Sequence, residues 1–187
     1  VMRFCQSFMA ELYRHIGADT DVPAGDIGVG AREIGYLFGM YKKIRNEYSG
    51  ILTGKGLEYG GSLARKEATG YGLIYFVLEM MRAHQLDPQG KRAIVSGSGN
   101  VAIYAAEKAL QNGIQVIAMS DSRGYIVDDQ LDLNVVKKIK EQLRTSLSAY
   151  PEMAGHGEYH EGSVYDAGLK AELALPCATQ NEINKER

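Results

Sequence analysis

The sequence predicts an α/β protein whose larger part is an incomplete doubly wound domain, preceded by the end of another α/β domain. Two observations lead to this class. From about residue 67, apolar runs of strand character alternate with segments of helical spacing. A glycine-rich turn joins the first of these runs to the helix after it. Alternation of this kind implies a parallel sheet covered by helices.

Composition sets the limits of the function. The chain has 187 residues, 45% of them hydrophobic, which suits a globular protein better than a disordered one. A net charge of −2 gives no electrostatic reason to expect nucleic acid or an anionic membrane as a partner. No apolar stretch approaches the roughly 18 residues of a membrane span. The cysteines, Cys5 and Cys177, lie at opposite ends of the chain, so we expect no disulfide framework and a reducing, cytoplasmic setting.

Residues 1–63 are expected to close the first domain. Helical spacing of apolar residues runs from Met2 to Ile16, and a second apolar stripe follows a polar loop and runs from Ile34 to Ile44. A glycine-dense stretch, 54–61, then connects to the second domain, residues 64–187. No capping residue precedes the first helix, and a new helix could begin at the last residues. Both ends are therefore expected to be internal to a longer protein.

The second domain is expected to contain three helices and three strands in alternation. The Pro88-Gln89-Gly90 sequence follows its first helix as a stop signal, and Pro176 ends its last strand. A parallel sheet follows from this order because each strand is separated from the next by a helix. The expected elements are a helix over 67–84, a strand over 91–96, a helix over 101–112, a strand over 114–119, a helix over 133–148 and a strand over 171–175.

The turn at residues 97–102 matches G-x-G-x-x-G/A, with Ala102 in the last place. Gly97 suits the tight turn, and Gly99 leaves room for a pyrophosphate against the backbone. The amides and the dipole of the helix that begins here favour the phosphate charge. The turn predicts a Rossmann-like dinucleotide site, with a purely packing role as the alternative.

Two residues after the second strand favour different dinucleotides. Asp121 lies about 20 residues beyond the turn, where a carboxylate binds the ribose hydroxyls of NAD. Arg123 could instead pair with the 2′-phosphate of NADP, or be a solvated loop charge.

The loop 19–28 places carboxylates beside glycines, where a ligand can approach the backbone closely. Asp26 in this loop is a candidate general acid and base. The alternative is that Asp26 caps the second helix and that its neighbours stabilise turns.

Metal sites are not expected. A calcium loop beginning at Asp19 would need an oxygen ligand and a glycine where Pro23 and Ala24 stand. His156 and His160 are four residues apart, but the glycines around them oppose a helix, so they are expected to be solvated loop residues.

Several motifs resemble the hexameric bacterial glutamate dehydrogenases, within the family of glutamate, leucine, phenylalanine and valine dehydrogenases. The resemblance covers essentially the whole chain, and the Pro-Ala-Gly-Asp-Ile-Gly form of the aspartate loop is characteristic of the glutamate enzymes. It rests on the segments 19–30, 53–56, 67–72, 95–102 and 175–182.

This resemblance implies an oxidoreductase that reversibly deaminates L-glutamate to 2-oxoglutarate and ammonium, with hydride transfer to NADP, or alternatively to NAD. A Ser-Asp-Ser sequence after the second strand accompanies NADP use in the most similar subgroup. Asp26 would transfer protons at the substrate nitrogen, and the carbonyl of Gly25 would contact the amino group. The cofactor contacts would come from Thr69, Gly97, Gly99, Asn100, Val101, Ser120, Asp121, Arg123, Ala178 and Gln180.

The resemblance also implies what these residues lack. The catalytic lysine of the family precedes the first helix, and a serine that contacts the substrate side chain follows Arg187. We therefore expect a homohexameric full-length enzyme and an inactive isolated chain. The rival readings are a dehydrogenase of leucine, phenylalanine or valine, and a dinucleotide-binding module without catalysis.

Overall fold

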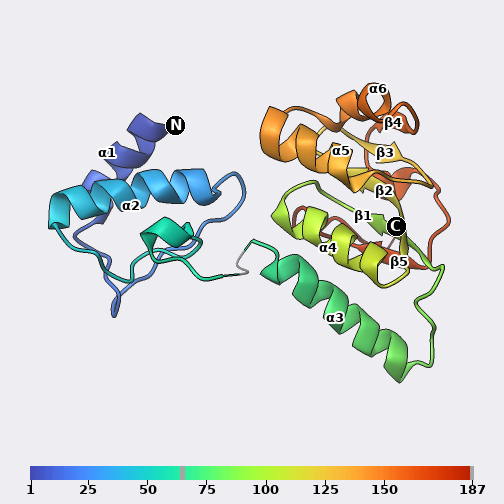
Figure 1. Ribbon diagram of the computed structural model, residues 1–187, viewed down its shortest axis with the longest axis horizontal. Coiled ribbons are helices and arrows are strands. Elements are labelled where there is room, and N and C mark those ends of the chain that lie inside the picture. The colour runs from blue at the N-terminus through green and yellow to red at the C-terminus, as the bar shows by residue number, and fades with distance from the viewer. Residues whose placement is uncertain (64–65, 186–187) are drawn as a thin grey trace. The chain divides into compact units, whose positions relative to one another are not determined.

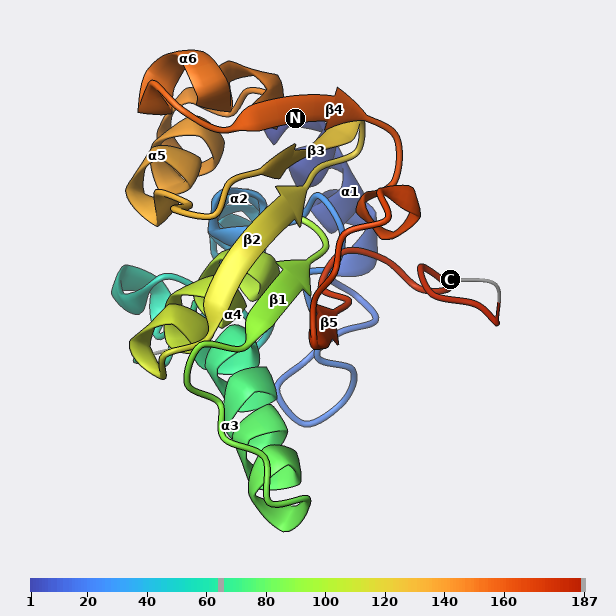
Figure 2. The ribbon, with the colours of Figure 1, turned by 90° about the vertical axis from the view of Figure 1, so that its right-hand side faces the viewer.

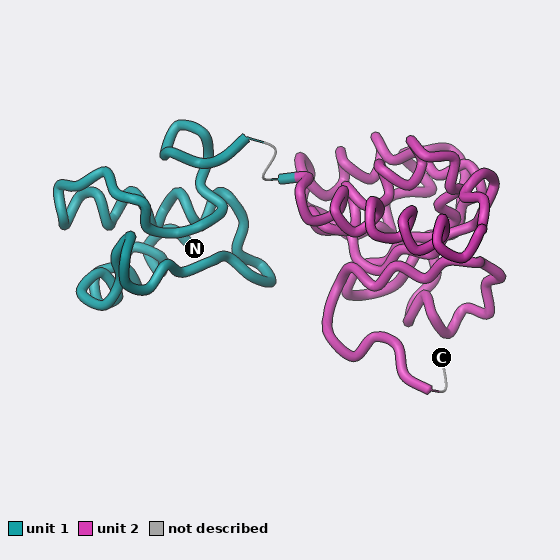
Figure 3. The backbone as a smooth tube through the Cα atoms, turned by 90° about the horizontal axis from the view of Figure 1, so that it is seen from below, with its two compact units in different colours: residues 1–66 teal, residues 67–187 magenta. Residues whose placement is uncertain are grey.

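The computed structural model describes residues 1–63 and 66–185 (Figure 1). The chain forms two compact units, residues 1–66 and 67–187, which Figure 3 draws in two colours. The sequence analysis expected the domain boundary between residues 63 and 64. Residue 64 lies outside the described residues.

The first unit is built around two helices, α1 (Met2–Leu12) and α2 (Ala31–Arg45). Met9 of α1 and Phe38 of α2 are fully buried in one cluster, to which the loop after α2 contributes Ile51. Spacing of three and four residues puts the buried side chains of α2 on one face. The unit also contains a short 3-10 helix, η1 (Leu57–Tyr59).

The second unit contains the predicted alternation of helices and strands, with additions. Asp132 caps the helix after the third strand by accepting the amide of Asn134 at 2.9 Å. The elements are α3 (Ala68–Ala83), β1 (Arg92–Val95), α4 (Asn100–Gln111), β2 (Gln115–Ser120), β3 (Gly124–Val127), α5 (Leu133–Lys137), the π-helix η2 (Lys138–Leu143), η3 (Leu147–Ala149), α6 (Tyr150–Ala154), β4 (Glu158–Glu161), η4 (Val164–Asp166) and β5 (Leu173–Leu175).

The strands form one sheet in the order β4-β3-β2-β1-β5, which can be followed in Figure 2. β1 pairs in parallel with both β2 and β5, and β3 pairs antiparallel with β2 and β4. The carboxyl ends of β1, β2 and β5 therefore lie at one edge of the sheet. The α/β class with an incomplete, Rossmann-like sheet is confirmed.

The two faces of the sheet are covered differently. Ala93 and Val95 of β1 belong to the core cluster that contains α4 and α5, whereas Ile94 points to the opposite face. On that opposite face Ile94 joins a smaller cluster with Val164, from the connection between β4 and β5. The period of two in β1 thus serves both faces, as expected for a buried parallel strand.

Helices α3 and α4 touch backbone to backbone at Gly70. A methyl group on Gly70 would lie 2.5 Å from the amide nitrogen of Ala105 and 2.7 Å from the carbonyl oxygen of Val101. Both are main-chain atoms of α4, so neither can move aside as a flexible side chain would. Gly70 therefore permits a crossing that brings the first turn of α3 against the first turn of α4.

Two expectations for the second unit were wrong. The helix expected over 133–148 ends at Arg144, which adopts a left-handed φ of 54°. β3 and β4 were not expected; β4 is a polar edge strand without an apolar alternation. His156 and His160 are exposed, as expected, but His160 lies in β4 and not in a loop, and its ring stacks on Tyr125. His156 Nδ1 lies 2.6 Å from Asp128 Oδ2.

Within residues 1–63 and 66–185, none of the helices has the length and apolar character that crossing a bilayer requires. The same residues contain no group of three or more histidine, cysteine and acidic side chains arranged to hold a metal ion.

Substitution of Gly70 by alanine should strongly destabilise the second unit. The added methyl group must push α3 away from the α4 backbone, and overpacking of this kind costs about 1–3 kcal/mol or more. Urea unfolding followed by circular dichroism measures the loss.

Gly72, on the exposed side of α3, is the matched control because a methyl group there meets no atom within 4 Å. Gly72→Ala should gain roughly 0.5–1 kcal/mol from helix propensity. Equal effects of Gly70→Ala and Gly72→Ala would show that the crossing is not as close as described.

Candidate functional site

The glycine turn after β1 brings three strand ends together. Gly97 has a left-handed φ of 87°, and a methyl group on it would lie 3.0 Å from Cβ of Ala178, beyond the end of β5. The amide of Gly97 donates to the buried hydroxyl of Ser120, at the end of β2, at 2.9 Å. Gly97 therefore allows the ends of β1, β2 and β5 to meet.

The loop after β5 is held by two side chains that the sequence analysis did not single out. The hydroxyl of Ser96 accepts the amide of Cys177 at 2.9 Å. Glu182 Oε1 accepts the amides of Ala178 at 3.0 Å and Thr179 at 2.6 Å. A signal for the second contact was present, because Thr179-x-x-Glu182 has the spacing of a capping box. Gln180 lies exposed in this loop.

Helix α4 begins directly at the turn. Gly99 is its N-cap residue, with φ of −85°, and a methyl group built on Gly99 would meet no atom within 4 Å. Asn100 and Val101 form the first turn, whose amides have no acceptor inside the helix. Open space at Gly99 beside these amides and the positive end of the helix dipole suits a phosphate group.

Thr69 comes to the same place through the α3–α4 crossing. It is exposed in the first turn of α3, next to Gly70, which packs on the carbonyl of Val101. The first turns of α3 and α4 therefore lie together at the carboxyl edge of the sheet. In open α/β sheets, ligands bind at this edge.

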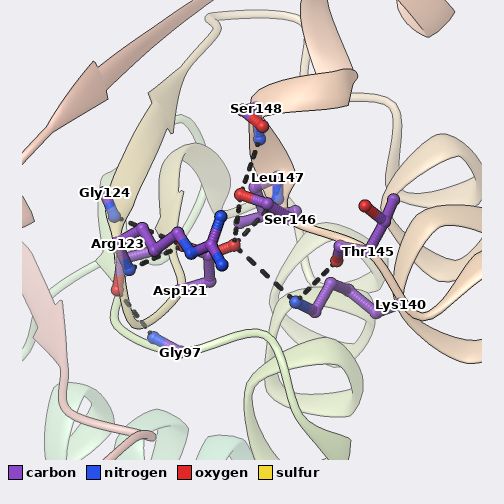
Figure 4. Close-up of polar contacts among 10 residues, drawn as sticks. Gly97, Asp121, Arg123, Gly124, Lys140, Thr145, Ser146, Leu147 and Ser148 are labelled. Atoms are coloured by element: carbon purple, nitrogen blue, oxygen red, sulfur yellow. Dashed lines mark hydrogen bonds and ion pairs between the residues drawn. The ribbon is translucent and has the colours of Figure 1, made fainter.

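Asp121 is surrounded by donors from its own chain (Figure 4). Its Oδ1 accepts the amides of Arg123 at 3.0 Å and Gly124 at 3.3 Å. Its Oδ2 accepts the amide of Leu147 at 2.8 Å and the hydroxyl of Ser146 at 3.1 Å. The side chain is 6% exposed. Its four contacts join the β2–β3 turn to the start of η3.

The charge state of Asp121 follows from these contacts. Burial alone would raise its pKa, but the hydrogen bonds from Leu147, Arg123 and Ser146 outweigh burial and lower the pKa. Lys140 Nζ, 3.7 Å from Oδ2, acts in the same direction. Asp121 is therefore ionised at neutral pH. Arg123 presents an exposed side chain from the same turn.

The aspartate loop belongs to the first unit. Asp26 is exposed, and its Oδ1 accepts the amide of the next residue, Ile27, at 2.8 Å. A methyl group on Gly25 would lie 2.7 Å from the carbonyl oxygen of Val29, so Gly25 permits a tight fold of the loop. The alternative in which Asp26 caps the second helix is wrong, because the N-cap residue of α2 is Gly30.

Of the residues expected to bind a cofactor, those from 69 to 178 gather around the end of β1. Gly97 bonds Ser120 and lies against Ala178, and Gly70, the neighbour of Thr69, packs on the backbone of α4. Gly25 and Asp26 lie in the other unit. The arrangement in the second unit can hold an anionic, extended ligand across the ends of parallel strands.

Comparison with known proteins agrees with this geometry. Residues 60–187 match the family described as Glutamate/Leucine/Phenylalanine/Valine dehydrogenase. Residues 1–43 match the Glu/Leu/Phe/Val dehydrogenase dimerisation domain. The chain belongs to the Glu/Leu/Phe/Val dehydrogenase family.

Individual members of the family resemble the chain over nearly all its length. It is 55% identical to the NADP-specific glutamate dehydrogenase of Helicobacter pylori, covering 98% of this chain and 43% of that protein. It is 53% identical to the NAD(P)-specific glutamate dehydrogenase of Xylanibacter ruminicola, over 99% of this chain and 42% of that protein. The crystal structure of Plasmodium falciparum glutamate dehydrogenase superposes with a TM-score of 0.88 at 48% identity, over 96% of this chain and 39% of that one. The chain thus spans about two fifths of the length of these family members.

Substitution of Asp121 by asparagine should destabilise the second unit by about 1.5–3 kcal/mol at neutral pH, because an amide cannot accept all four donors. A lowered pKa means that the ionised carboxylate contributes stability above its unfolded value, near 3.8, and loses it as pH falls through the folded value. The difference between wild type and Asp121→Asn should therefore shrink in acid. Urea unfolding across pH measures it.

Asp129→Asn is the control, because Asp129 is 70% exposed and forms a surface ion pair with Arg92. It should change stability little at any pH. A difference between wild type and Asp121→Asn that stays constant with pH would contradict the assigned charge state.

Proposed function

We propose that the chain is part of a glutamate dehydrogenase that reversibly converts L-glutamate and water to 2-oxoglutarate and ammonium, with NADP as the preferred hydride acceptor. Membership of the family supports a dehydrogenase of an amino acid. The names of the most similar relatives support glutamate as the substrate.

One observation carries the proposal: open space at Gly99 beside the first turns of α3 and α4. The residues present fit a dinucleotide, since a methyl group on Gly99 would point into space that no protein atom occupies. The amides of Asn100 and Val101 would hold the pyrophosphate there. Thr69, Ala178 and Gln180 would line the path towards the nicotinamide. When bound, the dinucleotide supplies the hydride acceptor.

The environment of Asp121 favours NADP over NAD. Its two oxygens already accept four donors within the chain, which leaves it poorly placed to accept ribose hydroxyls. Arg123 offers an exposed cation from the same turn, and a guanidinium pairs well with a phosphate. We infer that Asp121 shapes this turn and that Arg123 pairs with the 2′-phosphate, beside Ser120 at the end of β2.

Asp26 is the proposed proton carrier. An exposed carboxylate can take a proton from the substrate ammonium and return it when the imine is hydrated and ammonia leaves. The carbonyl of Gly25 would accept a hydrogen bond from the same amino group. Both roles use the tight fold of the loop, in which Gly25 packs against the carbonyl of Val29.

The proposal extends to the complete protein that contains these residues. That protein would act as a homohexamer on glutamate, 2-oxoglutarate and ammonium. A cytoplasmic location is part of the proposal and is supported by Cys5 and Cys177, which are both free thiols.

Gly99→Ala should weaken dinucleotide binding by this chain roughly tenfold or more, since a methyl group would occupy the place of closest approach of the pyrophosphate. The fold should be kept, because φ of −85° is accessible to alanine. Fluorescence titration with NADPH and with NADH measures the affinity, and wild type should bind NADPH more tightly.

Gly72→Ala, on the exposed side of α3, is the control and should bind as wild type does. Unchanged NADPH affinity in Gly99→Ala would place the dinucleotide elsewhere. Tighter binding of NADH than NADPH by wild type would contradict the role of Arg123.

In the complete protein, Asp26→Asn should lower kcat with glutamate by roughly 100-fold or more, as expected for loss of a general acid and base. NADPH affinity should be unchanged. Steady-state assays with glutamate, leucine, phenylalanine and valine measure both the rate and the substrate choice.

Asp19→Asn, an exposed carboxylate of the same loop, is the control and should retain the rate. Full activity of Asp26→Asn would remove the proposed mechanism. Preference for leucine, phenylalanine or valine would change the substrate, and a wild type without any turnover would favour a dinucleotide-binding module.

A further inference from the structure

Lys55 is a half-buried lysine whose ammonium group is bound by main-chain carbonyls. Its Nζ donates to the carbonyl oxygens of Ile51 at 2.5 Å and Leu52 at 2.6 Å. The ring of Phe38 lies 5.7 Å from Nζ, at a distance where a cation is attracted to an aromatic face. Burial lowers the pKa of Lys55. An ammonium group placed in this way loses part of its hydration, and the hydrogen bonds to the two carbonyl oxygens compensate for that loss.

The two carbonyls belong to a turn with an unfavourable backbone. Leu52 has a left-handed φ of 62°, a region that side chains with a Cβ rarely adopt. The side chains of Ile51 and Leu52 are both buried in the core of the first unit, and their packing anchors the turn. Two carbonyl dipoles that converge on one point repel each other unless a cation lies between them. The ammonium of Lys55 supplies that cation and stabilises the turn.

This turn is joined to the aspartate loop by a main-chain hydrogen bond. The amide of Thr53 donates to the carbonyl of Pro23 at 2.9 Å. The side chain of Ile34 lies against both segments: a methyl group on Gly54 would be 4.0 Å from it, and one on Gly25 would be 3.6 Å from it. The backbone from Pro23 to Gly25 is therefore held between the turn and α2.

The position of the Asp26 carboxylate depends on this backbone. Asp26 is exposed, and its contact with the amide of Ile27 lies within its own turn. A side chain anchored in this way moves with its main chain. Displacement of Pro23 would therefore displace Asp26, which follows it by three residues.

We propose that Lys55 is a positioning residue for proton transfer at Asp26: its ammonium holds the Ile51–Lys55 turn, which fixes Pro23 and hence the aspartate loop. The inference rests on the proposed function. Lys55 acts through the carbonyls of Ile51 and Leu52 and not through contact with the substrate. The Ile51–Lys55 turn then acts on the aspartate loop through the hydrogen bond from the amide of Thr53 to the carbonyl of Pro23.

Lys55→Met in the complete protein tests the proposal, because methionine keeps the length of the side chain and removes the cation. The kcat per folded enzyme should fall roughly 10- to 100-fold, the size expected when a catalytic group is misplaced by about 1 Å. The KM for NADPH should be unchanged, since the turn lies in the other unit from the glycine motif. Lys55→Arg keeps a cation and should recover part of the rate.

Lys43→Met is the matched control, because Lys43 is an exposed lysine of α2 in the same unit. It should keep the rate of wild type. A local readout comes from amide hydrogen exchange of the 187-residue chain. The Thr53 amide should exchange faster in Lys55→Met than in wild type. In Lys43→Met it should exchange at the wild-type rate.

The outcomes separate this inference from the proposed function. If Lys55→Met matches Lys43→Met in kcat while Asp26→Asn is inactive, Lys55 has no positioning role and the proposed function stands. A loss in Lys55→Met that only reflects its unfolded fraction, with unchanged exchange at Thr53, would also overturn the inference. Full activity of Asp26→Asn would overturn both.

Discussion

The second unit depends on the contact of two helix backbones at Gly70. The carbonyl of Val101 and the amide of Ala105 come so close to Gly70 that no side chain fits between α3 and α4. Small residues on α4, such as the fully buried Ala102 and Ala106, let the same helix lie flat on the sheet. α4 is thus held between α3 and the sheet, and its first turn can point only at the carboxyl edge. The proposed phosphate site at Gly99 follows from this placement.

The buried carboxylate at this edge stabilises the fold through contacts within its own chain. Asp121 occupies the position where a ribose-binding carboxylate is expected, yet it joins two segments of its own chain through four donors. In the first unit, the ammonium group of Lys55 similarly donates hydrogen bonds to two carbonyl oxygens of a turn. A buried charge needs compensating hydrogen bonds, and a site made from such charges is already organised before a ligand arrives.

Local sequence predicted the elements whose signals are local. The unit of β1, glycine turn, α4 and β2 was predicted within a few residues, because its glycines and its apolar periods lie within one stretch of chain. The break at Arg144 could not be read in this way, since Ser146 and Leu147 leave the helix to bond Asp121, which is more than twenty residues earlier in the sequence. The strand β4 was not predicted because it is defined by its pairing with β3 and not by a hydrophobic pattern in its sequence. Within the site, the sequence located the turn and the aspartate loop but not the roles of Gly70, Lys55 and Glu182. Gly70 acts through a contact with the distant backbone of α4. Lys55 and Glu182 bond residues three or four positions away, but these contacts form only in the irregular turns that the folded chain adopts there.

Amide chemical-shift mapping by NMR, with NADP+ added to this chain, tests the central claim most directly. Saturable changes are expected that are largest at Gly99, Asn100 and Val101 and that extend to Thr69 on α3. Saturable binding with its largest changes away from these two helix starts would contradict the account. The absence of any change in a folded chain would do the same.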